Sequence, residues 1–106
     1  MTDKRIVLST AGSEDEARKI AHHLVDHHLA ACVNLVPRIE SIYRWHGKVE
    51  SSQEWLLVIK TTAERFPAVC NAIQELHSYE LPECIVISVE DGSTEYLEWI
   101  ADSLQP

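Results

Sequence analysis

The feature that most restricts how this chain can fold is an uninterrupted apolar run, Trp55-Leu56-Leu57-Val58-Ile59, in a stretch of strand character. Successive side chains of a strand point to opposite faces of a sheet, so this run predicts a strand that avoids water on both faces. Ile85-Val86-Ile87 repeats the pattern near the end of the chain. If helices cover one face of the sheet, the other face also needs a cover. We therefore expect a homo-oligomer, in which copies of the sheet cover one another.

The order of the predicted elements is strand, helix, strand, strand, helix, strand, followed by a last helix. This is the ferredoxin-like βαββαβ pattern, an α/β (α+β) fold, and its length predicts a single domain over residues 1–106. The first helix follows Ser13 and has a length of about 16 residues by its apolar period. The other predicted elements are strands at 5–10, 31–45, 48–61 and 84–89, a helix around 66–76, and a short helix after Ser93.

Three local patterns fix the details of this prediction. Gly47 supplies the positive φ of a tight turn, so the second and third strands form a long β-hairpin. Pro37 cannot donate to a ladder and predicts a bulge or an edge position. Ser13 and Glu16 have the spacing of a capping box at the start of the first helix.

Charge and composition exclude several classes of partner. The chain has 9 basic and 17 acidic residues, a formal net charge of -8, and no clustered stripe of Lys and Arg, so we expect neither nucleic acid nor a membrane surface as a partner. Residues 1–5 lead directly into a strand without a signal-peptide pattern, which predicts a cytoplasmic protein. Cys32, Cys70 and Cys84 contain no C-x-x-C pair, and we expect free thiols in packing roles.

Catalytic motifs are missing from the sequence. There is no G-x-S-x-G, no phosphate-cradling glycine-rich loop and no H-E-x-x-H. Acylphosphatase shares the ferredoxin-like pattern but needs a glycine-rich anion loop with an Arg after the first strand, where this chain has Ser9-Thr10-Ala11-Gly12-Ser13. We expect that the protein is not an enzyme, and keep an enzyme of small acyl or phosphoryl substrates as an alternative.

Several segments together resemble the CutA family of divalent-cation tolerance proteins. They are Ala30–Asn34, Ser41–Gly47, Lys60–Thr62, His77–Glu83 and Tyr96–Trp99, in the family's order and over nearly the whole chain. The resemblance implies a ferredoxin-like homotrimer, related to PII signalling proteins, with three sheets packed around a central axis. It also implies a role in tolerance of copper and other divalent cations, without a catalytic activity.

The same resemblance points to candidate metal ligands. His77 matches the histidine of the family's metal-associated segment, and with Glu83 and Cys32 it offers imidazole, carboxylate and thiolate to copper or another divalent metal. Some relatives have a cysteine at the end of the first strand and a second histidine before the matching one. Here those positions hold Ser9 and Leu76.

Trp45, Lys60 and Tyr79 are candidates for a pocket at the junction of subunits, where oligomers often hold small ligands. Such inter-subunit clefts would take a metal ion or a small molecule. The alternative for Lys60 is an ion pair at the interface. The alternative function is a PII-like trimer that senses a small molecule or a partner protein through these clefts.

A second group of histidines lies on the first predicted helix. His23 and His27 are four residues apart and share a helix face, which is a spacing that can chelate a metal. The same pair is also typical of a solvated surface near a helix C-terminus, where a positive charge suits the helix dipole. We expect the solvated surface.

Overall fold

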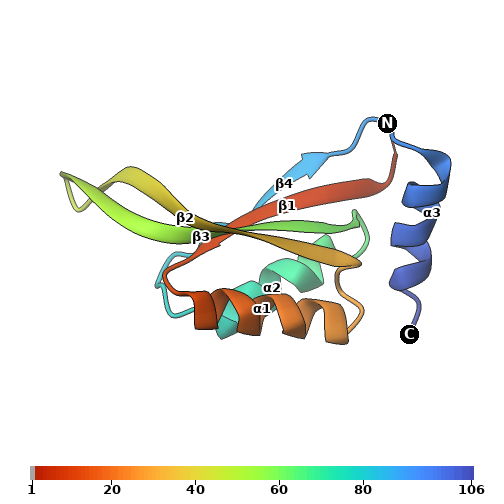
Figure 1. The fold of residues 1–106 in the computed structure, drawn as a ribbon, viewed down its shortest axis with the longest axis horizontal. Helices are drawn as coiled ribbons and strands as arrows, with labels where there is room; N and C mark the ends of the chain where they lie inside the picture. The colour runs from red at the N-terminus through yellow and green to blue at the C-terminus, as the bar shows by residue number, and fades with distance from the viewer. Residues whose placement is uncertain (1) are drawn as a thin grey trace.

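The computed structural model describes residues 2–106 and forms one four-stranded sheet with three helices (Figure 1). The strand order is β2-β3-β1-β4 and every neighbouring pair is antiparallel, which confirms the predicted ferredoxin-like topology. The elements are β1 (Lys4–Ala11), α1 (Glu14–Asp26), β2 (Cys32–Trp45), β3 (Lys48–Thr62), α2 (Phe66–Leu76), β4 (Ile85–Ser88) and α3 (Thr94–Ser103).

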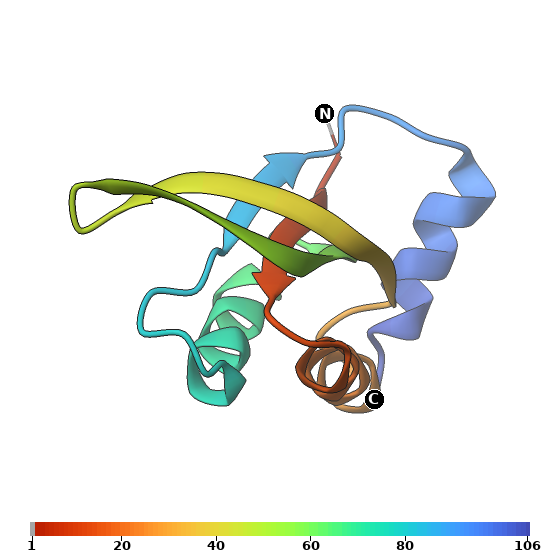
Figure 2. The ribbon, with the colours of Figure 1, turned by 60° about the vertical axis from the view of Figure 1, so that its left-hand side comes forward.

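One face of the sheet carries the hydrophobic core. Helices α1 and α2 lie side by side against this face, whereas α3 lies beside the end of the sheet (Figures 1 and 2). Val7 on β1 pairs with Ile59 on β3, and both are fully buried, as is Leu57. The alternate apolar positions of the run found in the sequence therefore point toward the helices. Helix α1 completes this layer with Ala17, Ile20, Ala21 and Leu24.

The opposite face of the sheet has no helix over it, and it is also apolar (Figure 1). Leu8 pairs with both Val58 and Ile85, which places all three on this side. Ile85 is 53% exposed and Ile87 is 46% exposed, large values for isoleucines on a sheet. We call this surface the open face; its apolar members are Ile6, Leu8, Val36, Leu56, Val58, Ile85 and Ile87.

The β2–β3 hairpin projects beyond the rest of the sheet (Figure 2). Trp45 pairs with Lys48 across a two-residue turn, in which His46 and Gly47 both have positive φ, as a tight hairpin turn requires. The predicted irregularity at Pro37 is confirmed by a register shift between Val36 and Ile39. The sequence pattern did not show that Arg38 takes the strained position there, with φ 57°.

Helix α1 is shorter than the sequence pattern predicted. It ends at Asp26, after 13 residues, because His28 adopts a left-handed φ of 57° and turns the chain back toward the sheet. The Nδ1 atom of His28 lies 3.3 Å from the carbonyl oxygen of Ser103, so the ring connects this turn to the end of α3. The apolar pattern of the sequence extends past the end of the helix because Leu29 and Ala30, which follow it, also pack in the core.

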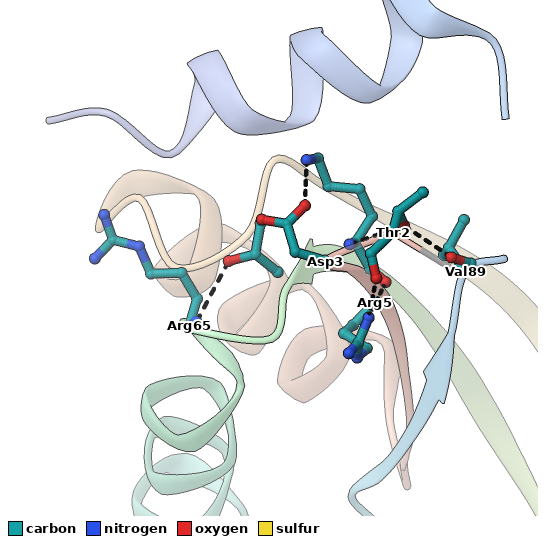
Figure 3. A network of polar contacts seen from close by, with 7 residues as sticks. Thr2, Asp3, Arg5, Arg65 and Val89 are labelled. Atoms are coloured by element: carbon teal, nitrogen blue, oxygen red, sulfur yellow. Dashed lines mark hydrogen bonds and ion pairs between the residues drawn. The ribbon is translucent and has the colours of Figure 1, made fainter. Parts of the chain in front are cut away.

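Polar contacts hold the chain ends against the sheet. The Thr2 hydroxyl donates to the Val89 carbonyl at 2.7 Å, which joins the N-terminal segment to the residue after β4 (Figure 3). The Arg65 guanidinium donates to the Leu104 carbonyl at 2.9 Å and ties α3 to the start of α2. Within residues 2–106, no helix has the length and apolar character needed to cross a bilayer.

Ser9 places a polar group in the core, and residues 2–106 offer it no hydrogen-bond partner. It lies on the helix-covered face of β1, is fully buried, and its hydroxyl has no hydrogen-bond partner among the described residues. We expect Ser9→Ala to raise the free energy of unfolding by about 1 kcal/mol, because it removes an unsatisfied buried polar group and little volume. Denaturant unfolding measures this change. A loss of stability would show that the hydroxyl has a partner, such as a buried water.

Candidate functional site

A cavity of about 390 Å³ lies where the base of the hairpin meets the connection between α2 and β4. Three carboxylates and three aromatic side chains contribute to its wall, and no Lys, Arg or His does. We call it the acidic cavity; its lining residues are Thr10, Tyr43, Trp45, Ser52, Glu54, Tyr79, Glu80, Leu81 and Glu83.

The strand register explains why these residues meet. Glu54 alternates with Leu56 and Val58 along β3, so its side chain points to the same side of the sheet as the open face. The opposite wall comes from residues 79–83, in the connection that leaves α2 and runs toward β4 on the hairpin side (Figure 2). The acidic cavity is therefore a continuation of the open face.

A hydrogen bond between Tyr79 and Glu54 joins the two walls of the acidic cavity. The Tyr79 hydroxyl donates to Oε2 of Glu54 at 2.7 Å, and Glu54 is only 6% exposed. Burial and the bond to this carboxylate raise the pKa of Tyr79, so the phenol stays protonated as a donor. Gly12 permits this position, because a Cβ there would lie 2.9 Å from the phenol oxygen.

His77 is a structural brace for this connection. Its side chain is fully buried, its Nε2 lies 2.6 Å from the Thr10 carbonyl, and its Nδ1 lies 3.0 Å from the Tyr79 amide nitrogen. A carbonyl only accepts and an amide N–H only donates, so these two contacts assign the donor role to Nε2 and the acceptor role to Nδ1. Both nitrogens are occupied, and neither is available to a metal ion in this arrangement.

Glu16 adds a second brace beside His77. Its carboxylate accepts from the Ser78 amide at 2.6 Å and from the Ser78 hydroxyl at 3.0 Å. Half of the predicted capping box is confirmed, since Ser13 Oγ accepts from the Glu16 amide at 3.2 Å. The reciprocal half is wrong, because the Glu16 side chain reaches residue 78 instead of the start of its own helix.

The pKa of Glu83 shows the effect of the burial and negative charge in the acidic cavity. Burial, together with the charge of Glu54, raises the pKa of Glu83 above its usual value of 4.5. A bound cation would relieve this repulsion by neutralising the carboxylates. Chemically, the acidic cavity suits a cation, which its carboxylates attract and its aromatic faces also accept.

The structure separates Cys32 and Lys60 from the acidic cavity. The two residues pair with each other between β2 and β3, and the Lys60 ammonium contacts the Asn34 side-chain oxygen and the Cys32 sulfur. Lys60 lies six residues along β3 from Glu54, which corresponds to about 20 Å of strand. Within one chain, Trp45 and Tyr79 therefore come together and Lys60 does not, while the predicted pocket between subunits stays a prediction.

Within one chain, the predicted metal ligands also stay apart. Glu83 lines the acidic cavity, His77 lies behind it with both nitrogens engaged, and Cys32 lies at the far end of the sheet. His23 and His27 stack with ring centroids 4.1 Å apart, and the His27 ring contacts the His23 carbonyl. In residues 2–106 no three His, Cys, Asp or Glu side chains are grouped so that they would hold a metal ion.

Comparison with known proteins places the fold and these segments in one family. A sequence model of the family described as "CutA1 divalent ion tolerance protein" matches residues 5–103. The chain belongs to this family. The family is named for tolerance of divalent ions and not for a reaction.

Similar proteins come from distant organisms. The divalent-cation tolerance protein CutA of Thermus thermophilus is 45% identical over 94% of this chain and 97% of its own length. A chloroplastic CutA of Arabidopsis thaliana is 41% identical over 92% of this chain, which spans 54% of that longer protein. The crystal structure of CutA from Xylella fastidiosa superposes with a TM-score of 0.96 at 40% identity, covering 98% of this chain and 100% of that one.

The expectation of a cytoplasmic protein is contradicted by the names of these relatives. The Arabidopsis relative is called chloroplastic. A structure from Archaeoglobus fulgidus is described as a periplasmic divalent cation tolerance protein, with a TM-score of 0.93 and 37% identity over 96% of this chain and 99% of that chain. The family is therefore not tied to the cytoplasm, and the first residues of this chain are no guide to its compartment.

The sequence did not predict Thr10 and Tyr43 as parts of the site, and it suggested Glu54 only as a counter-charge for Lys60 and not as the partner of Tyr79. Glu54 did carry a signal, because a carboxylate directly before a run of apolar residues is a costly position on a strand. Its partner Tyr79 is 25 residues away, and only the folded connection after α2 brings the two together. Nothing local to either residue predicts that contact.

Proposed function

We propose that this protein is a homotrimer that contributes to tolerance of divalent cations by binding the cation in the acidic cavity. The observation that carries this proposal is the wall of the cavity, which has three carboxylates and no basic side chain. Because no three of these side chains are grouped as a ready-made metal site within residues 2–106, the cation would keep water molecules among its ligands. Such a wall concentrates cations and excludes anions. We infer no catalytic role for the cavity.

The trimer is supported by the open face. Each apolar side chain removed from water contributes about 1.5–3 kcal/mol, and the open face presents seven of them on one surface. A monomer would leave this surface in water, which favours association. The assembly with three copies follows from the resemblance to the PII-like architecture. The acidic cavity adjoins the open face, so it lies at the rim of the proposed interface.

The donor set decides which metal the acidic cavity suits. Glu54 and Glu83 offer carboxylate oxygens, which suit hard cations such as Mn²⁺, Mg²⁺ and Ca²⁺. Copper binds such oxygens too by the general affinity order, but its selective imidazole and thiolate ligands are absent from the wall. The residues of one chain therefore do not fit a dedicated copper site, and we propose a divalent-cation site without copper selectivity.

Titration calorimetry with Mn²⁺ tests the site. We expect saturable binding by the wild type and at least a tenfold loss of affinity for Glu83→Gln, which removes one ligand charge and keeps the shape. Glu98→Gln, on the exposed surface of α3, removes the same charge elsewhere and should bind as the wild type does. Equal affinity of the Glu83 variant and the wild type would refute the site.

The raised pKa of Glu83 predicts how binding depends on pH. Between 4.5 and its raised pKa, the folded protein holds a proton on Glu83 that the unfolded chain has released. The contribution of this proton to stability therefore grows as the pH falls through that window, and cation binding, which displaces the proton, weakens. We expect the Mn²⁺ affinity to fall toward pH 4.5 in the wild type, and to fall less steeply in Glu83→Gln.

A second candidate function is favoured by the aromatic side chains of the cavity. Tyr43, Trp45 and Tyr79 line it beside the carboxylates, an arrangement that also binds organic ammonium groups. In this case the protein would be a PII-like trimer that senses a small cationic molecule. Quenching of Trp45 fluorescence by tetramethylammonium but not by Mg²⁺ would favour this function over metal binding.

A further inference from the structure

Two cysteines outside the acidic cavity lie against each other. Cys70 is on α2 and Cys84 directly precedes β4, and the Cys70 thiol donates to the Cys84 sulfur with 2.6 Å between the sulfur atoms. Both side chains are free thiols and both are half-buried, so a small oxidant has access to them. The sequence predicted packing roles for both residues, because free cysteines without a C-x-x-C pair behave as small hydrophobic residues.

The connection between α2 and β4, which forms one wall of the acidic cavity, lies between these two cysteines in the sequence. At its start this connection is held firmly, by His77 on Thr10, by Ser78 on Glu16 and by the Tyr79 hydroxyl on Glu54. Among the described residues, positions 80–83 make no hydrogen bond that ties them down, although Glu80, Leu81 and Glu83 line the cavity. The next point of attachment is Cys84, where the chain meets Cys70.

We propose that Cys70 and Cys84 form a reversible disulfide that ties residues 80–84 to α2, with a low-molecular-weight disulfide such as oxidised glutathione as the oxidant. One of the two thiols loses its proton to water and attacks one sulfur of oxidised glutathione, which gives a mixed disulfide and releases one glutathione thiolate. The other thiol then loses its proton to water and attacks the protein sulfur of the mixed disulfide, which releases the second glutathione thiolate. Two protein thiols are oxidised by two electrons, and one oxidised glutathione is reduced to two thiols.

The geometry selects this pair of thiols, because the two sulfur atoms already lie in contact and either thiol can make the first attack. Cys32 takes no part, because it lies on β2 beside Lys60.

Thiol counting on the folded protein tests the pair. After incubation with oxidised glutathione and removal of the reagent, we expect a fall from three reactive thiols per chain to one, measured after denaturation. Cys32→Ser should fall from two to none, and dithiothreitol should restore both. Peptide mapping without reduction should show residues 70 and 84 in one linked product.

The matched control is Cys70→Ser, which is similar in size and leaves Cys84 without its partner. We expect this variant to form no intramolecular disulfide, and residues 80–84 to exchange amide hydrogens at the same rate with or without oxidant. In the wild type, oxidation should slow that exchange severalfold. Retention of both thiols by oxidised Cys32→Ser, or a link that includes residue 32, would overturn the proposal.

Discussion

Val58→Asp is expected to convert the proposed trimer, with a mass of about 36 kDa, into single chains of 12.0 kDa. Val58 lies in the middle of the open face, paired with Leu8 on one side and Asn34 on the other. A carboxylate at this position would be buried without a partner in the trimer, which costs several kcal/mol per subunit, whereas water solvates it in the monomer. Light scattering on a sizing column measures the change.

The same substitution on the helical layer is the control for this result. Val25 on α1 is 41% exposed and lies on the other side of the sheet, so Val25→Asp should leave the assembly unchanged. Circular dichroism shows whether each variant keeps its fold. A folded Val58→Asp protein with the mass of the wild type would exclude the open face as the interface, and a wild type of 12.0 kDa would exclude the trimer itself.

His77→Ala is expected to lower the free energy of unfolding by about 3 kcal/mol, because each buried group left unpaired costs about 1–3 kcal/mol. The substitution removes the partners of the Thr10 carbonyl and the Tyr79 amide and leaves a cavity between β1 and the connection after α2. Chemical denaturation measures the loss. If His77 is a brace and not a ligand, the number of Mn²⁺ ions bound per chain stays the same in whatever fraction remains folded.

His77→Asn separates the two contacts. An asparagine oxygen can accept from the amide two residues on, as Nδ1 does from Tyr79, but the shorter side chain does not reach Thr10. We therefore expect about half of the loss seen for alanine. Equal stability of all three proteins would contradict the bracing role, and loss of one metal ion per chain in folded His77→Asn would make His77 a ligand.

Much of the fold followed from patterns that act over short distances. The apolar run at 55–59 predicted a strand that avoids water on both faces, and the register shows Leu57 toward the helices and Val58 toward the open face. Gly47 and Pro37 predicted the turn and the bulge through constraints on their own backbones. Each of these signals is intrinsic to a residue or to its neighbours.

The site was less predictable because its contacts cross the fold. Glu16 was expected to cap its own helix, but its carboxylate instead accepts a hydrogen bond from the backbone amide of Ser78, 62 residues away. Lys60 was grouped with Trp45 and Tyr79 in a pocket between subunits, and within one chain it lies at the other end of β3 from these two residues, so that pocket stays a prediction. Residue type alone suggested candidate site residues. The strand register and the path of residues 77–84 determine which of these residues lie together in one chain.

The position of the acidic cavity links assembly to binding. Because Glu54 is on the same side of β3 as Val58, a subunit seated on the open face in the proposed trimer would lie next to the mouth of the cavity. Loss of the assembly should therefore change access to the carboxylates as well as the mass of the particle. A comparison of Mn²⁺ affinity in wild type and folded Val58→Asp measures this coupling.

The most direct test of the proposed function is anomalous X-ray diffraction from a crystal of the protein soaked in Mn²⁺. We expect a peak in the acidic cavity, at about 2.0–2.6 Å from carboxylate oxygens of Glu54 and Glu83, with His77 still bonded to Thr10. A crystal of Glu83→Gln under the same conditions should lose the peak. A peak at Cys32, His77 or the His23–His27 pair, with the acidic cavity empty, would contradict the proposal.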